Sequence, residues 1–129
     1  MRRSALIAAA ALLAWSGPSP AAEARMDGRQ LLAVCDHAER DDAPKVSPFR
    51  AGQCLGFIAG TLKGWEAAAA VRNARPNYCI RPGVTLDELL RAVTKYVRAD
   101  PSRQHGQAEL LVISAVQQSF PCAPGDLKP

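Results

Sequence analysis

The stretch SPFRAGQCLGFIAGTLKGWEAAAAVRN, residues 47–73, predicts one long central helix against which the other segments pack. Ser47 offers a capping hydroxyl, and Pro48 fits the first helical turn because its missing N–H has no intrahelical role there. At about 100° per residue, one narrow stripe collects the side chains expected to face the core. These are Cys54, Ile58, Thr61, Leu62 and Trp65.

Four glycines on the opposite side of this helix form a second feature, the glycine face: Gly52, Gly56, Gly60 and Gly64. Each glycine inside a helix costs about 0.5–1 kcal/mol relative to alanine. Four in one row therefore predict a close helix–helix contact, within the fold or across a dimer axis. The alternative is a poor helix with incidental glycines.

The remaining segments predict an all-α fold, a single small domain of four to five helices. Asp27 caps a helix to about Arg40, and Thr85 with Glu88 forms a capping box for another. Asp100-Pro101 ends that helix, and residues 99–106 are predicted to form a polar, hairpin-like connection. Residues 107–120 are apolar around most of their circumference, which indicates a buried helix. The β-branched residues there leave a strand as the alternative.

The N-terminus has the pattern of a secretory signal peptide. A basic tip, Arg2-Arg3, precedes an apolar run from Ala5 to Trp15 and an Ala-x-Ala site at residues 22–24. The apolar run is shorter than the roughly 20 residues that span a bilayer. We therefore expect residues 1–24 to be removed and residues 25–129 to form the exported domain, which makes no membrane contact after signal removal.

Charge and composition limit the classes of partner that the protein could bind. The formal charge is +4, from 16 Lys and Arg against 12 Asp and Glu, with no block of like charge and only 5% aromatic residues. This pattern, together with export, argues against nucleic-acid binding. Mild basicity suits contact with an acidic protein or an anionic cell-wall polymer.

The four cysteines, an even number in a small exported chain, predict two disulfides. Three pairings are possible, and spacing alone does not decide between them. Helical phase favours Cys35–Cys54, because both cysteines lie on core-facing stripes. The loop residue Cys79 then pairs with Cys122, just past the last helix. A metal site formed by Cys35 and His37 is the less favoured alternative to the disulfides, since no second close pair of ligands completes a four-ligand site.

Catalytic chemistry has no clear carrier in the sequence. All four cysteines are expected in disulfides, and a cysteine nucleophile needs a free thiolate. His37 and His105 are the only histidines, and neither stands beside an evident partner. No phosphate-binding glycine loop or serine elbow is present. We expect no enzyme activity and no cofactor.

Four pieces of the sequence, in order, resemble the Rap/Tai family of periplasmic amidase-immunity proteins of type VI secretion. The pieces are CLGFIAG at 54–60, CIRPGVTL at 79–86, YVRADP at 96–101, and AELLV at 108–112 leading to FPC at 120–122. The likeness extends from about Leu31 to Cys122. It implies an all-helical, disulfide-bonded periplasmic homodimer that binds a cell-wall amidase effector and blocks its active-site cleft with a projecting loop.

Two segments could serve as that loop, residues 73–81 and residues 99–106. The second has a stiff Asp100-Pro101 start followed by side chains able to donate hydrogen bonds. We expect the partner-binding residues to be Asp100, Pro101, Ser102, Arg103, Gln104 and His105. A plain surface turn is the alternative for this segment. A general periplasmic binding or stress-protective module, with no toxin partner, is the alternative for the whole protein.

Overall fold

The computed structural model describes residues 25–40 and 47–126 and confirms the all-α fold. Its elements are α1 (Gly28–Glu39), α2 (Pro48–Val71), α3 (Leu86–Arg98), the short 3₁₀ helix η2 (Pro101–His105) and α4 (Ala108–Ser119). The only β-type pairing in the described ranges is a single bridge between Asp27 and Gln107. The predicted signal peptide lies outside the described residues. No helix in the described part of the chain is both long and apolar enough to span a bilayer.

Helix starts follow the predicted caps. The Asp27 carboxylate accepts the Gln30 N–H at 2.8 Å, and the Gln30 side chain accepts the Asp27 N–H at 2.9 Å. Thr85 and Glu88 form the same reciprocal pair at the start of α3. Such capping boxes satisfy N–H groups that a helix leaves without internal partners.

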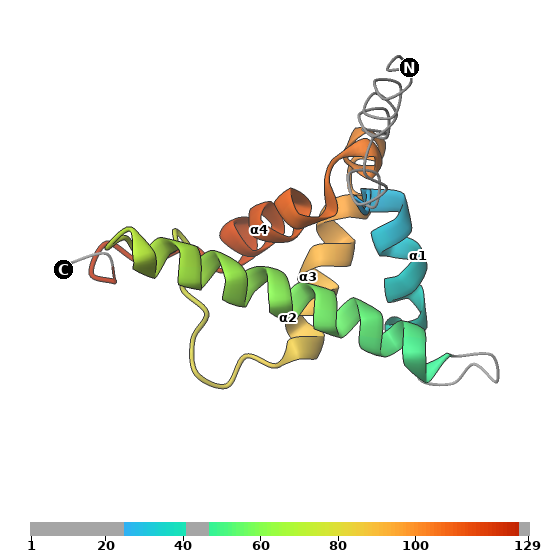
Figure 1. The fold of residues 1–129 in the computed structure, drawn as a ribbon, viewed down its shortest axis with the longest axis horizontal. Helices are drawn as coiled ribbons and strands as arrows, with labels where there is room; N and C mark the ends of the chain where they lie inside the picture. Colours follow the sequence, from blue (N-terminus) through green and yellow to red (C-terminus); the bar gives the residue numbers. More distant parts are fainter. Residues whose placement is uncertain (1–24, 41–46, 127–129) are drawn as a thin grey trace, which may run out of the picture.

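Helix α2 is the axis of the domain. Its 24 residues make a rod of about 36 Å. In Figure 1, α1 lies toward the N-terminal end of α2, α4 toward its C-terminal end, and α3 crosses it between them. The predicted stripe is largely confirmed, because Cys54, Ile58 and Leu62 are buried, whereas Thr61 and Trp65 are half-buried.

The core lies where α3 and α4 meet the stripe on α2. Its largest fully buried side chains come from all four α-helices: Leu31, Ile58, Leu90, Val93, Val97, Val112 and Val116. Leu86, at the start of α3, is 36% exposed. It occupies the first helical position, where the chain has just entered the helix at the edge of the domain.

Both predicted disulfides are confirmed, Cys35–Cys54 and Cys79–Cys122. The first joins α1 to α2 inside the core, where both cysteines are 0% exposed. The second is half-buried and ties the 73–85 connection to the segment after α4. A backbone hydrogen bond from the Cys79 N–H to the Phe120 carbonyl, at 2.9 Å, supports this second tie.

One polar contact between α1 and α3 was not expected from the sequence. Buried Thr94 donates its hydroxyl to the Glu39 carboxylate, and Arg98 donates to the same carboxylate at 2.6 Å. Burial alone would raise the pKa of Glu39, but the hydrogen bonds from Arg98 and Thr94 outweigh it and hold the pKa below its usual range. This contact fixes the end of α1 against α3.

We predict that Glu39→Gln lowers the free energy of unfolding by about 1–3 kcal/mol at neutral pH, because it removes charge-assisted hydrogen bonds to a partly buried group. The folded-state pKa of Glu39 lies below the unfolded value of 4.5. Its contribution is therefore complete above that value and is lost as the pH falls through the folded pKa.

Chemical denaturation at pH 7 and at about pH 3 measures the effect, with the exposed Glu109→Gln as the matched control. The loss at Glu39 should shrink at the lower pH, and the control should stay within about 0.5 kcal/mol of wild type. An equal loss at both pH values would show that the Glu39 charge is not its source.

Candidate functional site

Hydrogen bonds within the turn η2 hold both of its ends. The Asp100 carboxylate accepts the Ser102 N–H at 2.9 Å and the Ser102 hydroxyl at 2.7 Å. These hydrogen bonds, aided by the nearby Arg103 charge, lower the pKa of Asp100. At the other end, the Gly106 N–H donates to the Arg103 carbonyl at 2.9 Å. The hairpin-like connection expected here is thus a short 3₁₀ helix.

The same turn is seated on the start of α1. The Gly28 N–H donates to the Gly106 carbonyl at 3.0 Å, and the Ala108 N–H donates to the Met26 carbonyl at 2.9 Å. A Cβ at Gly28 would lie 2.8 Å from the Arg103 carbonyl oxygen and 2.9 Å from the Gln104 Cα. Only glycine permits this approach, so Gly28 is the residue that lets the turn rest on α1.

Arg103 clamps the turn from the other side. Its guanidinium donates to the Tyr96 carbonyl at 2.7 Å and stacks 3.9 Å above the Tyr96 ring centroid. Its Nε atom is 3.7 Å from the Asp100 carboxylate. Part of the Arg103 guanidinium is thus engaged within the domain, and its contact with a partner stays a prediction.

The six residues expected to bind a partner remain together in the structure but differ in exposure. Pro101, Ser102 and His105 are exposed, whereas Asp100, Arg103 and Gln104 are half-buried. The turn therefore presents a small, stiff surface. That this surface contacts a partner stays a prediction.

Two residues of this site, Gly28 and Tyr96, were not identified from the sequence. A glycine directly after the cap residue Asp27 could have signalled a close backbone approach. Tyr96 begins the YVRADP piece of the family resemblance, but that piece does not reveal its contact with Arg103, which depends on Arg103 folding back onto the preceding helix.

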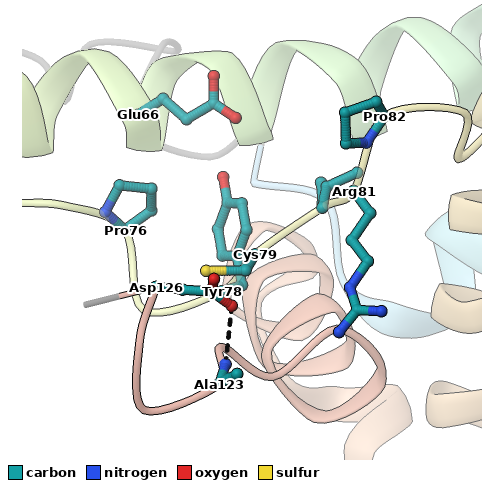
Figure 2. A pocket seen from close by; sticks show the side chains of 9 residues that line it. Glu66, Pro76, Tyr78, Cys79, Arg81, Pro82, Ala123 and Asp126 are labelled. Carbon is teal, nitrogen blue, oxygen red and sulfur yellow. Dashed lines mark hydrogen bonds between the residues drawn. The ribbon is translucent and has the colours of Figure 1, made fainter. Parts of the chain in front are cut away.

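The other candidate loop, residues 73–81, lines a pocket of about 530 Å³ (Figure 2). Its walls come from α2, from this loop and from the segment after α4. Lining residues include Glu66, Pro76, Tyr78, Arg81, Pro82 and Asp126. In Figure 2 the Tyr78 hydroxyl points toward Glu66 on α2, and the Ala123 N–H is bonded to the Asp126 carboxylate at 2.9 Å.

Most polar groups of this pocket already have partners. Tyr78 is buried and donates to the Leu62 carbonyl at 3.3 Å. Burial and the Glu66 carboxylate raise the pKa of Tyr78 to about 12, so it stays neutral. Glu66 pairs with Lys63 at 2.7 Å. Arg81 is exposed and has no ion pair among the described residues, which leaves one free cation at the edge of the pocket.

The glycine face is exposed to solvent in the single chain. A Cβ built on Gly52, Gly56, Gly60 or Gly64 would meet no atom within 4 Å. The expected close contact within the fold is therefore wrong, because α1, α3 and α4 all pack on the other sides of α2. Contact across a dimer axis stays a prediction. Beside Gly60 and Gly64, a largely apolar groove of about 270 Å³ runs between α2 and α4.

Groups associated with catalysis or metal binding do not assemble in the described ranges. All four cysteines are in disulfides. His37 accepts the Ser47 N–H at 3.4 Å through Nδ1, and His105 is an exposed residue of the turn. Within residues 25–40 and 47–126, no three His, Cys, Asp or Glu side chains are grouped as a metal site requires.

Comparison with known proteins gives one match. The family model for Rap1a immunity proteins matches residues 27–122. These residues run from the cap of α1 to the second cysteine of the Cys79–Cys122 bridge, so they include η2 and both disulfides. No curated protein and no solved structure matches significantly.

We predict that Gly28→Ala lowers the free energy of unfolding by about 1–3 kcal/mol, because the added methyl group overlaps the backbone of the turn. Gly125→Ala is the matched control, since a Cβ there meets nothing within 4 Å. Its stability should stay within about 0.5 kcal/mol of wild type. Equal stability of the two variants in thermal or denaturant unfolding would show that the turn does not rest on Gly28.

Proposed function

Because the chain belongs to the Rap1a family of immunity proteins, which bind a partner effector, we propose that it protects its own cell from a cell-wall amidase of type VI secretion. Residues 1–24 serve as the signal peptide, and residues 25–129 act in the periplasm. The protein is an inhibitor without enzymatic activity. It binds the amidase and closes the active-site cleft to peptidoglycan.

The rigid turn η2 is the observation that carries this proposal. Asp100 closes its start, Arg103 ties it to Tyr96, and Gly28 provides its seat. A loop already held in one conformation loses little conformational entropy when it enters a cleft. Pro101, Ser102 and His105 are the exposed tip that enters the cleft of the amidase.

We predict that the double variant Ser102→Arg with His105→Glu weakens inhibition of the amidase about 30-fold or more, the loss expected for a central interface residue. Both side chains are exposed, and the Asp100 carboxylate loses the Ser102 hydroxyl but keeps the Ser102 N–H, so the midpoint of thermal unfolding should fall by a few degrees at most. Arg103 is left intact because it holds the turn. The measurement is peptidoglycan hydrolysis by a small cysteine amidase found by a search of the neighbouring genes.

Arg81→Glu, on the other loop, is the control and should inhibit as wild type does. Loss of inhibition by Arg81→Glu, with full inhibition by the turn variant, would move the binding surface to residues 73–81. Failure of the wild-type chain to bind the amidase would refute the proposed function itself.

We further propose that the protein is a homodimer joined through the glycine face. Apart from Arg50, Gln53, Lys63 and Glu66, helix α2 carries small or apolar side chains, and an apolar helix surface is normally covered. Lys63 lies on the glycine face, where it is paired with Glu66. Phe49 and Val71, at the two ends of this face, are 74% and 84% exposed. Leu110, beside the adjacent groove, is 56% exposed. Glycines between such apolar ends allow the α2 helices of two chains to approach closely.

We predict that Gly60→Leu converts a dimer into a monomer, because the leucine side chain would separate the two helices by more than the contact allows. Within one chain the leucine has open space, so the helical content should be unchanged. Sedimentation equilibrium measures the mass of both proteins. A wild-type monomer at about 100 μM, a concentration at which even weak dimers associate, would refute the dimer.

The pocket in Figure 2 supports a second candidate, a periplasmic binding module without a toxin partner. Its volume of about 530 Å³ is in the range of sites for small molecules. Absence of a cysteine amidase gene near this gene would favour this second function.

A further inference from the structure

A smaller cleft lies beside the turn, between α3 and α4, and has a volume of about 240 Å³. Two cationic side chains line it, Lys95 of α3 and Arg103 of η2. The ring of Tyr96, on which Arg103 stacks, forms part of the wall. We call this space the α3–α4 cleft.

Hydrogen-bond donors and small side chains complete the cleft. Gln118 and Ser119, at the end of α4, add an amide and a hydroxyl to its lining. The small side chains of Ala92, on α3, and Ala99, its C-cap, also line the cleft. No carboxylate is among the lining residues, so the cleft presents two positive charges and two neutral polar groups.

The charges on α3 show why Lys95 differs from its neighbours. Arg91 is paired with Asp87 at 2.9 Å, and Arg98 with Glu39 at 2.6 Å. Lys95 lies between these two arginines on the helix and has neither an ion pair nor a side-chain hydrogen bond among the described residues. Its ammonium group is therefore available to an external anion.

Arg103 adds an oriented guanidinium to this free charge. The Tyr96 carbonyl and ring hold the guanidinium in place, and the Asp100 carboxylate, at 3.7 Å from Nε, balances only part of its charge. Asp100 also accepts two hydrogen bonds from Ser102. A fixed guanidinium and an unpaired ammonium that line the same cleft match the charge of a carboxylate.

We propose that the α3–α4 cleft binds an aspartate or glutamate side chain of the effector. This inference rests on the proposed function, because a partner that covers the turn also covers the cleft: Arg103 belongs to both. The turn fills the active site of the effector, and the cleft holds an acidic residue on the rim around that active site. Charge complementarity at such a rim sets specificity and the rate of association.

A titration that needs no effector tests the chemistry of the cleft. The chain, with both disulfides formed, is labelled with ¹⁵N and titrated with N-acetyl-glutamate amide, with the uncharged N-acetyl-glutamine amide as the control probe. The acidic probe should shift the backbone signals of Ala99, Gln118 and Ser119, with a dissociation constant of about 10 mM as expected for so small a ligand. Lys95→Gln should abolish these shifts. Equal shifts with both probes, or none, would overturn the proposal.

Binding to a cysteine amidase found among the products of neighbouring genes tests the partner. Lys95→Glu should weaken binding about 10-fold or more and reduce its dependence on salt. Arg50→Glu is the matched control, because it makes the same charge change at an exposed residue. Arg50 does not line the pocket of Figure 2, the groove beside Gly60 or the α3–α4 cleft, so this variant should bind the amidase as wild type does.

The outcomes separate the two proposals. If Lys95→Glu binds like wild type while the Ser102→Arg and His105→Glu variant does not, the effector has no acidic residue in the cleft and only this inference fails. If the wild-type chain does not bind the amidase, the proposed function fails and the inference fails with it.

Discussion

The Cys35–Cys54 disulfide is the interaction on which the position of the turn depends. Helix α1 fully buries two apolar side chains, Leu31 and Cys35, with Val34 and Ala38 packed partly against the core, so the disulfide involves half of its fully buried apolar contact. The disulfide closes a loop between cysteines 19 residues apart, a constraint of about 3 kcal/mol on the unfolded chain. It places α1 against α2, and α1 then offers Gly28 as the seat of η2. The surface assigned to the effector thus rests on a cross-link that lies entirely inside the core.

The local features of the sequence predicted the local structure well. Asp27, Ser47 and Thr85 are N-caps as expected, because a cap depends only on residues within one helical turn. Both disulfides also followed from the sequence, since helical phase brought Cys35 and Cys54 to facing stripes. The position of each helix along the chain could therefore be predicted almost to the residue.

Features that depend on residues far apart in the sequence could not be predicted. Glu39 bonds to Thr94 and Arg98, which are 55 and 59 residues away, and nothing near Glu39 indicates them. The glycine face was expected against another helix, yet within one chain a Cβ at any of the four glycines meets no atom within 4 Å. The turn was predicted by its place and polarity, but its contact with Gly28 and Tyr96 emerges only when the helices assemble. Periodicity identifies which side of a helix is apolar, but it does not identify what covers that side.

The bridge between Asp27 and Gln107 links the site to the folding of the whole domain. Its partners are about 80 residues apart, and contacts of such long range pay a large loop-closure entropy before they form. A chain that has formed only its local helices therefore lacks the contact between η2 and α1. The hydrogen bonds from Gly28 to Gly106 and from Ala108 to Met26 likewise form only once the start of α1 and the start of α4 have met. Under the proposed function, only assembled domains bind the effector, so a loss of stability anywhere in the domain lowers the concentration of protein able to bind.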